Sequence, residues 1–261
     1  MEPKYEEHFT AYLDFLGFSE ASTNINDATR LKVLDLLLSL SALRGDYNIE
    51  HSQNSSTFAI KPAISTFSDH IVISYPLRPV IAQFGQSEPL AAFVIMNEFT
   101  WRLAAIATAA LRIGFLVRGG ATVGNLYHAG GVVFGEALVE AFYLESRTSV
   151  YPRVILSQNI TGRQSWTELP RQIAKDNDGL YHVDYITIAL QAATLTADCK
   201  VWLADVFAVI CANLRELKSK GKLAELAKWT WFANHVRAAL ESATPETLEL
   251  LGLSLEAIPW S

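Results

Sequence analysis

The order in which strand-like and helix-like segments follow one another limits the first 186 residues of this chain to few folds. The hydrophobic pattern predicts strands over 8–17, 56–68, 70–76, 116–124, 125–135, 152–160 and 180–186, with helices over 26–43, 89–114 and 136–148. The resulting order up to residue 160, β-α-β-β-α-β-β-α-β, followed by a short final strand over 180–186, is typical of an α+β sheet of the ferredoxin-like split-βαβ type with helices packed on one face.

The remaining sequence has a different pattern. Residues 187–261 have helical spacing throughout and no strand signal, so we expect a catalytic or binding domain over 1–186 and a C-terminal helical extension over 187–261. Within the first domain, the leucine-rich segment 26–43 is predicted to be a mostly buried helix. The pairs 56–68 with 70–76, and 116–124 with 125–135, are predicted to be hairpins, the second of them rich in glycine.

Composition argues against several classes of protein. Twenty-seven acidic side chains against 21 basic ones give a net charge of -6, which argues against binding to bulk nucleic acid or to an anionic membrane. Two cysteines without CxxC spacing indicate neither a disulfide framework nor a zinc site. The most apolar stretch, 89–117, is interrupted by Glu98, Arg102 and Arg112, which argues against a membrane span, and the N-terminus carries no signal-peptide pattern. We therefore expect a cytoplasmic protein.

Two aspartates stand out against this background. Asp14 interrupts an apolar strand, and a buried carboxylate is costly unless a cation or hydrogen-bond donors neutralise it. Asp69 lies at the tip of the predicted hairpin, where aspartate is also ordinary in a turn. Because a split-βαβ sheet places the first strand beside that hairpin, the two carboxylates can converge, as a two-metal phosphoryl-transfer site requires.

Four segments, in order, resemble conserved segments of the class III nucleotide cyclases. AYLDFLGFS resembles the first metal motif of that family, and STFSD resembles the hairpin with its second metal-binding aspartate. FLVRGGATVG resembles the strand that follows, and GVVFGEALVEAFYLES resembles the entry to the next helix. The resemblance spans residues 8 to about 186 and implies a class III cyclase-like catalytic domain over 1–186.

The resemblance also implies roles for individual residues. Two divalent cations, Mg²⁺ or Mn²⁺, would be held by Asp14, Asp69 and the carbonyl of Phe15. Backbone amides at the strand end and one basic side chain would bind the triphosphate: Leu16, Gly17, Phe18, Ser19 and Arg118. The ribose 3′-oxygen would then attack the α-phosphorus in line, and pyrophosphate would leave.

The chain departs from the purine-specific members of the family at residues that recognise the base and stabilise the transition state. Those members place Lys or Glu four residues before the hairpin aspartate, where this chain has Ser65, with Phe67 on the same strand face. The transition-state Asn and Arg, which the other subunit contributes, align with Val139 and Tyr143, and the Tyr143 hydroxyl is the expected substitute for the Arg.

The chain is similar to the pyrimidine cyclases of bacterial Pycsar anti-phage systems in its segments 135–145 and 176–186 and in its helical extension. That similarity implies a homodimer with composite sites, which converts UTP to cyclic UMP that acts on a separate effector. CTP is the alternative substrate.

The sequence is also compatible with two other functional hypotheses. One is a degenerate cyclase fold that binds nucleotide without turnover, and the other is a nucleotidyl transferase of the polymerase-palm kind, which the acidic charge disfavours. Glu140 and Glu145 either orient groups across a dimer or form a solvated face or a helix-packing ion pair. Asp176 and Asp178, in a DNDG sequence, are interpreted as turn residues.

Overall fold

The computed structural model describes residues 4–18, 27–42, 44–51, 58–167, 173–196, 198–252 and 258–259. The chain divides into two compact units. One comprises Met1–Phe99 with Val117–Val183, and the other comprises Thr100–Leu116 with Asp184–Ser261. The predicted domain boundary after residue 186 stays a prediction.

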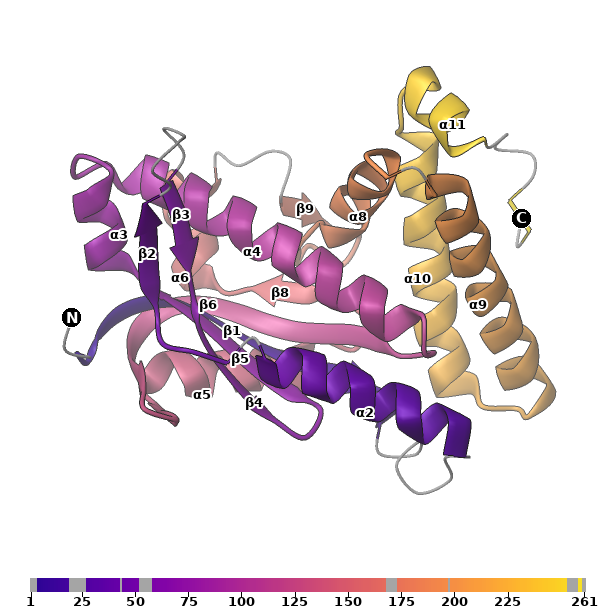
Figure 1. Cartoon of the computed structure of the whole chain (residues 1–261), viewed down its shortest axis with the longest axis horizontal. Coiled ribbons are helices and arrows are strands. Elements are labelled where there is room, and N and C mark those ends of the chain that lie inside the picture. The colour runs from indigo at the N-terminus through magenta and orange to yellow at the C-terminus, as the bar shows by residue number, and fades with distance from the viewer. Residues whose placement is uncertain are drawn as a thin grey trace. The chain divides into compact units, whose positions relative to one another are not determined.

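A mixed eight-stranded sheet forms the centre of the first unit (Figure 1). Its order is β4 (Ala63–Phe67), β5 (His70–Pro76), β1 (Glu6–Leu16), β6 (Leu116–Ala129), β8 (Val154–Leu156), β10 (Tyr181–Val183) and β9 (Ile173–Lys175), and β7 (Val132–Phe134) pairs with β6. The β6–β8 pair is parallel, whereas β1–β5 and β4–β5 are antiparallel. A separate two-stranded sheet contains β2 (Asn48–His51) and β3 (Phe58–Lys61). The protein is therefore α+β, as predicted.

The predicted first strand and first hairpin are confirmed. β1 is buried along most of its length, and its Phe9 ring stacks on Trp166 with centroids 5.6 Å apart. β5 lies directly beside β1, with Asp14 opposite His70 in the register. The turn between β4 and β5 is at Ser68 and Asp69, where the sequence places it. The part of the predicted strand before Pro62 instead belongs to β3 in the small sheet.

The first unit contains the three predicted helices in the predicted order, together with short helices that were not predicted. They are α2 (Asp27–Ala42), α3 (Leu77–Gln83), the start of α4 (Glu88–Leu111), α5 (Glu136–Tyr143) with the π-helical turn η1 (Leu144–Thr148), α6 (Gln158–Thr161) and α7 (Gln164–Thr167). By length and composition α4 could cross a membrane, but more than half of its apolar stretch is buried inside the protein, as for a core helix.

The expectation that α2 is mostly buried is wrong. Leu31, Leu34 and Leu38 are 50–67% exposed, whereas Val33 and Leu36 are buried. The leucines of this helix lie on two faces because their spacing combines two series of i, i+3 and i+4 positions. Only one of those faces packs against the rest of the protein.

The glycine-rich hairpin forms, but its turn is not where the sequence analysis places it. β6 continues through Gly124 to Ala129, and the chain reverses at Gly130 and Gly131, whose φ values are 58° and 77°. Left-handed backbone of this kind favours glycine. The predicted strand over 152–160 is only the three residues of β8 before α6 begins, and β9 was not predicted.

The second unit contains helices in its described C-terminal part, as predicted. They are α8 (Tyr185–Thr194), α9 (Cys199–Ser219), α10 (Leu223–Glu241) and α11 (Pro245–Leu251). α9 and α10 lie side by side (Figure 1), and apolar side chains such as Leu203, Ile210 and Phe232 form the buried core. Helix α8 begins at its N-cap Asp184, whose carboxylate accepts a hydrogen bond from the Thr187 amide.

Candidate functional site

The sheet brings the two predicted metal-binding aspartates together. Asp14, near the end of β1, is only 7% exposed, and Asp69 occupies the β4–β5 turn on the neighbouring strand pair. One ligand atom each from Asp14, Asp69 and His70 lie within 4.8 Å of one another. The convergence that the split-βαβ argument anticipates is therefore present, although the two aspartates are far apart in the chain.

His70 completes this cluster and was not singled out by the sequence analysis. Its Nε2 lies 3.6 Å from Asp14 Oδ1, and its Nδ1 lies 3.4 Å from Asp69 Oδ1. The imidazole thus faces both carboxylates. Two carboxylates and an imidazole form a donor set that accepts Mn²⁺ and other transition-metal ions, whereas oxygen-only sites suit Mg²⁺. The residues present therefore fit a divalent cation.

Arg118 and Glu145 form the other side of the cluster. Arg118, on β6, donates from Nε to Asp14 Oδ2 at 3.1 Å, and its Nη2 lies 2.7 Å from Glu145 Oε1. Glu145 belongs to the π-helical turn η1 and is 3% exposed. Of the alternatives for Glu145, the structure favours a buried ion pair over a solvated face. Glu140 accepts hydrogen bonds from Thr122 and Asn159 within its own chain.

Burial dominates the electrostatics of this site. It raises the pKa of Glu145, and the nearby Arg118 charge opposes that shift. Burial, reinforced by the negative charges of Glu145, Asp14 and Asp69, raises the pKa of the neighbouring Tyr12 hydroxyl to about 12. Tyr12 is therefore a neutral hydrogen-bonding group at physiological pH. The negative charges that surround Tyr12 also favour the binding of a cation at this site.

The proposed triphosphate-binding turn is partly described. Leu16 ends β1, and Gly17 follows with a φ of 92°, a conformation that glycine adopts without strain. Phe18 is half-buried, and the Phe15 side chain is buried in the core. Ser19 lies outside the described residues. The structure thus shows a glycine turn directly after the strand that carries Asp14.

A pocket of about 660 Å³ lies beside the carboxylate cluster. Its wall includes Tyr12, Arg44, Ser65, Phe67, His70 and His128. His70 is therefore shared between the pocket and the cluster. Phe67 is 81% exposed at the rim, and the Ser65 hydroxyl lies 2.9 Å from His128 Nε2. The two residues expected to contact a base, Ser65 and Phe67, thus line the same pocket.

Tyr143 lies in a different place from the carboxylate cluster. It is 45% exposed on α5 and lines a second pocket of about 650 Å³, together with Val139, Asn125, Asn159 and Arg163. The Arg147 guanidinium lies 4.4 Å from the centre of its ring. Within one chain, Tyr143 is not among the residues that line the first pocket.

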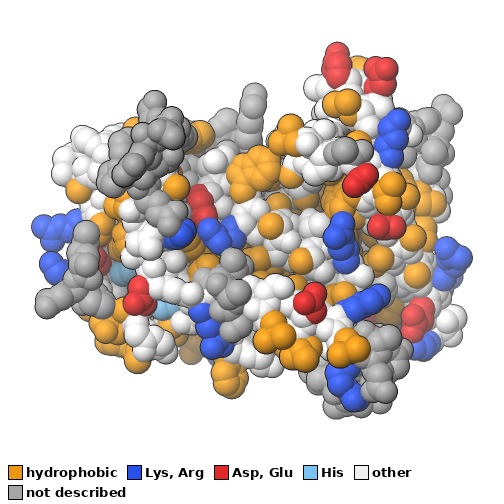
Figure 2. Space-filling model, in the orientation of Figure 1, with side chains coloured by type: hydrophobic (Ala, Val, Ile, Leu, Met, Phe, Trp, Pro, Cys, Tyr) orange, Lys and Arg blue, Asp and Glu red, His pale blue; other side chains and the backbone are white. Residues whose placement is uncertain are grey.

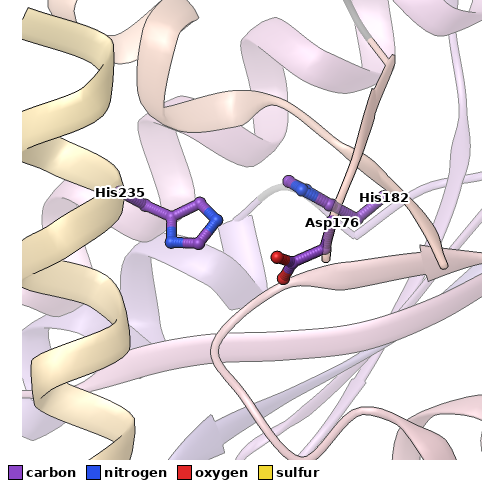
Figure 3. Close-up of side chains that lie close together, drawn as sticks. All are labelled: Asp176, His182 and His235. Carbon is purple, nitrogen blue, oxygen red and sulfur yellow. The ribbon is translucent and has the colours of Figure 1, made fainter. Parts of the chain in front are cut away.

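The acidic DNDG segment has a structural role in the first unit. Figure 3 shows Asp176, directly after β9, and His182 on β10. Asp176 and Asp178 form the turn and also pair with Arg153, a side chain that is 1% exposed. The interpretation of both aspartates as turn residues is confirmed, and the buried ion pair is an additional finding. His235, also drawn in Figure 3, lies on α10 and stacks on Trp231 of the same helix.

Charged side chains on the surface are mixed in sign. On the face shown in Figure 2, the coloured Lys and Arg side chains are interspersed with Asp and Glu and do not form one continuous field. This distribution agrees with the acidic net charge of -6.

Comparisons with known proteins add one structural similarity. No protein-family model and no curated protein matches the chain. Among solved structures, the chain is similar to a bacterial light-regulated adenylyl cyclase, with 14% sequence identity and a TM-score of 0.33. The match covers 71% of this chain and 53% of that one, so the chain spans about half the length of that structure.

Proposed function

We propose that this protein is a nucleotide cyclase with a class III cyclase domain of the split-βαβ type. The observation that carries the proposal is the convergence of Asp14 and Asp69 on neighbouring strands, with His70 facing both carboxylates. A glycine turn at the end of β1 and a pocket that shares His70 lie next to this cluster. Together they offer a place for the phosphates and the base of one nucleoside triphosphate.

Asp14 and Asp69 would hold the divalent cations, with the Phe15 carbonyl as a further ligand. When bound, Mg²⁺ or Mn²⁺ would neutralise the triphosphate and lower the pKa of the ribose 3′-hydroxyl. The protein contributes position: the amides of residues 16–19 hold the phosphates, so that the 3′-oxygen faces the α-phosphorus in line. A new bond from O3′ to the α-phosphorus would then form, and the bond between the α-phosphorus and the oxygen that bridges it to the β-phosphate would break. Pyrophosphate would leave, and the hydroxyl proton would pass to solvent.

In this proposal the Arg118 guanidinium has two alternative sets of partners, the carboxylates of the site and the triphosphate. The guanidinium pairs with Asp14 and Glu145 in the structure, so each of these carboxylates already has a positively charged partner. A triphosphate would compete for the same guanidinium, since phosphate oxygens accept its hydrogen bonds as carboxylates do. The same ion pairs favour the alternative of a cyclase-like protein that binds nucleotide without turnover.

We further propose a pyrimidine substrate, UTP in the first place and CTP as the alternative. The support is the pocket of about 660 Å³ with Ser65 on its wall and Phe67 at its rim. The product, cyclic UMP, would be a second messenger for a separate effector in anti-phage defence, made in the cytoplasm. A homodimer would bring the Tyr143 helix of one chain over the aspartates of the other.

The test is incubation of the purified protein with ATP, GTP, CTP or UTP and Mn²⁺, with products identified by mass spectrometry. We expect a cyclic monophosphate from UTP, absent in the Asp69→Ala variant. Asp35→Ala, at an exposed position of α2, is the matched control and should retain full activity. Cyclic AMP as the main product would contradict the pyrimidine assignment. No product from any nucleotide, with binding retained, would support the non-catalytic alternative.

A further inference from the structure

The pocket beside the carboxylate cluster contains a chain of three hydrogen-bonded side chains from three strands. Ser65 Oγ, on β4, lies 2.9 Å from His128 Nε2 on β6. The other ring nitrogen, Nδ1, lies 2.8 Å from Ser74 Oγ on β5. Ser65 and His128 line the pocket, whereas Ser74 is fully buried behind them. The hydroxyl on the pocket wall is therefore tied to a buried hydroxyl through one imidazole.

His128 is neutral in this environment. It is 7% exposed, and burial lowers its pKa to about 4. The nearby His8 contributes to this lowering of the pKa, and Asp46 opposes it. A neutral imidazole carries one N–H donor and one nitrogen acceptor, so the roles of its two nitrogens are linked. Fixing the role of Nδ1 therefore fixes the role of Nε2.

The buried serine fixes the direction of the chain. Within the described part of the protein, His128 Nδ1 is the partner that the structure gives to the Ser74 hydroxyl. A buried hydroxyl that fails to donate its hydrogen is destabilised by the full cost of desolvation. Ser74 thus donates to Nδ1, and Nε2–H donates to Ser65 Oγ. The hydrogen of the Ser65 hydroxyl is then free to point into the pocket.

We propose that His128 and Ser74 are positioning residues that hold Ser65 as a hydrogen-bond donor toward the ligand. The donor selects a nucleobase that presents a carbonyl oxygen at that point, and hence uracil over cytosine. At that point uracil carries an oxygen that can accept this hydrogen, whereas cytosine carries an amino group that cannot accept it. This inference rests on the proposed nucleotide site and adds to it how the protein recognises the base.

The test measures equilibrium binding of UTP and CTP by calorimetry, with Ca²⁺ in place of the catalytic cation. The proteins are the wild type, Ser65→Ala, His128→Leu and the double variant. We expect the wild type to bind UTP about tenfold more tightly than CTP, a ratio typical of one hydrogen bond gained or lost. The ratio should fall to within about twofold in each single variant, with no further change in the double variant.

His8→Leu is the matched control. His8 is a buried histidine of the same sheet, 5% exposed, and its Nδ1 faces the Glu6 carbonyl outside the chain of three side chains. Its replacement should lower the melting temperature, as His128→Leu does, without changing the ratio of UTP to CTP affinity. Ser74→Ala should reduce the ratio as His128→Leu does, because it releases Nδ1 from its donor.

Three results would overturn the inference. The first is tighter binding of CTP than of UTP by the wild type, and the second is an unchanged ratio of UTP to CTP affinity in His128→Leu. The third is that His128→Leu changes this ratio as much in the Ser65→Ala protein as it does in the wild type. The binding readout separates this inference from the proposed function. If the preference for UTP over CTP depends on His128 but no cyclic product forms, only the proposed cyclisation is contradicted. If cyclic product forms but the preference does not depend on His128, only the proposed recognition of the base is contradicted.

Discussion

At the scale of single residues, the buried carboxylates of the site differ in how far neighbouring positive charges offset their desolvation. Asp14 is compensated by Arg118 at 3.1 Å and by His70, whereas Glu145 is compensated mainly by Arg118. Burial nevertheless raises the pKa of Glu145, so desolvation outweighs the attraction of the guanidinium. The cluster is therefore an acidic site that gains stability when further positive charge arrives.

A bound cation should stabilise the protein through the two aspartates. At a hundredfold excess of Mn²⁺ over its Kd, binding adds about 2.7 kcal/mol, which for a chain of this size corresponds to a rise in Tm of about 5–10 °C. We expect this rise in the wild type and its loss in Asp14→Asn and Asp69→Asn. Differential scanning fluorimetry with and without EDTA measures it. Asp35→Asn should respond like the wild type, and an undiminished rise in both site variants would exclude metal binding there.

Glu145 should make stability depend on pH in a definite direction. Because folding raises its pKa, its contribution is fully present below the unfolded pKa, near 4.3, and is lost as the pH rises through the folded value. Glu145→Gln stays neutral throughout. The wild type should therefore lose stability relative to Glu145→Gln as the pH rises above about 4.3. Urea unfolding at several pH values tests the sign, and the opposite trend would mean that the Arg118 ion pair dominates.

At the scale of elements, the close contact of β6 with α5 and η1 positions Glu145. A Cβ on Gly120 would clash with the Ala141 carbonyl oxygen and Leu144 Cβ and would lie 3.0 Å from the Glu145 amide nitrogen. Glycine at this point of β6 lets the π-helical turn approach the strand. Such turns occur often at functional sites, and this one directs Glu145 toward Arg118.

Gly120→Ala should therefore disturb both stability and the site. Overpacking of this kind costs about 1–3 kcal/mol, and the shift of η1 should weaken the Arg118–Glu145 pair. We expect a lower midpoint of urea unfolding and a reduced cyclisation rate. Gly124→Ala is the control on the same strand, since its Cβ would lie 3.4 Å from Ala137 Cβ. Equal losses in the two variants would contradict a specific role for the Gly120 contact.

Alternation and turn chemistry suffice to predict β1 and the β4–β5 hairpin, and with them the meeting of Asp14 and Asp69. The same rules misplace the turn after β6, because Gly124 and Asn125 have turn-forming residue types but lie within the strand. Gly130 and Gly131 have the left-handed backbone instead. His70, Glu145 and His128 could not be assigned to the site from spacing, since their partners are set by strand register and by a π-helical turn.

At the scale of the whole molecule, Tyr143 lines the second pocket and not the pocket beside the aspartates of its own chain. Val139 and Tyr143 are 50% and 45% exposed on α5, and Phe142 is 42% exposed beside them. Apolar side chains gathered on one helix face are common at interfaces between subunits. A twofold dimer would use the same helix from both chains, so each site would combine the aspartates of one chain with Tyr143 of its partner.

Mixing two inactive variants tests this arrangement directly. Asp69→Ala and Tyr143→Ala should each be inactive as pure proteins, because every site then lacks one essential group. In an equal mixture after subunit exchange, half of the dimers are mixed, and each mixed dimer has one site with both groups intact. We therefore expect recovery of about a quarter of the wild-type rate, measured as cyclic nucleotide formed per chain. A mixture of Asp69→Ala with Asp14→Ala should recover nothing, because both changes then affect the same half of the site. If the Tyr143 mixture also recovers nothing while a mixed dimer is demonstrated by mass spectrometry, Tyr143 acts within its own chain.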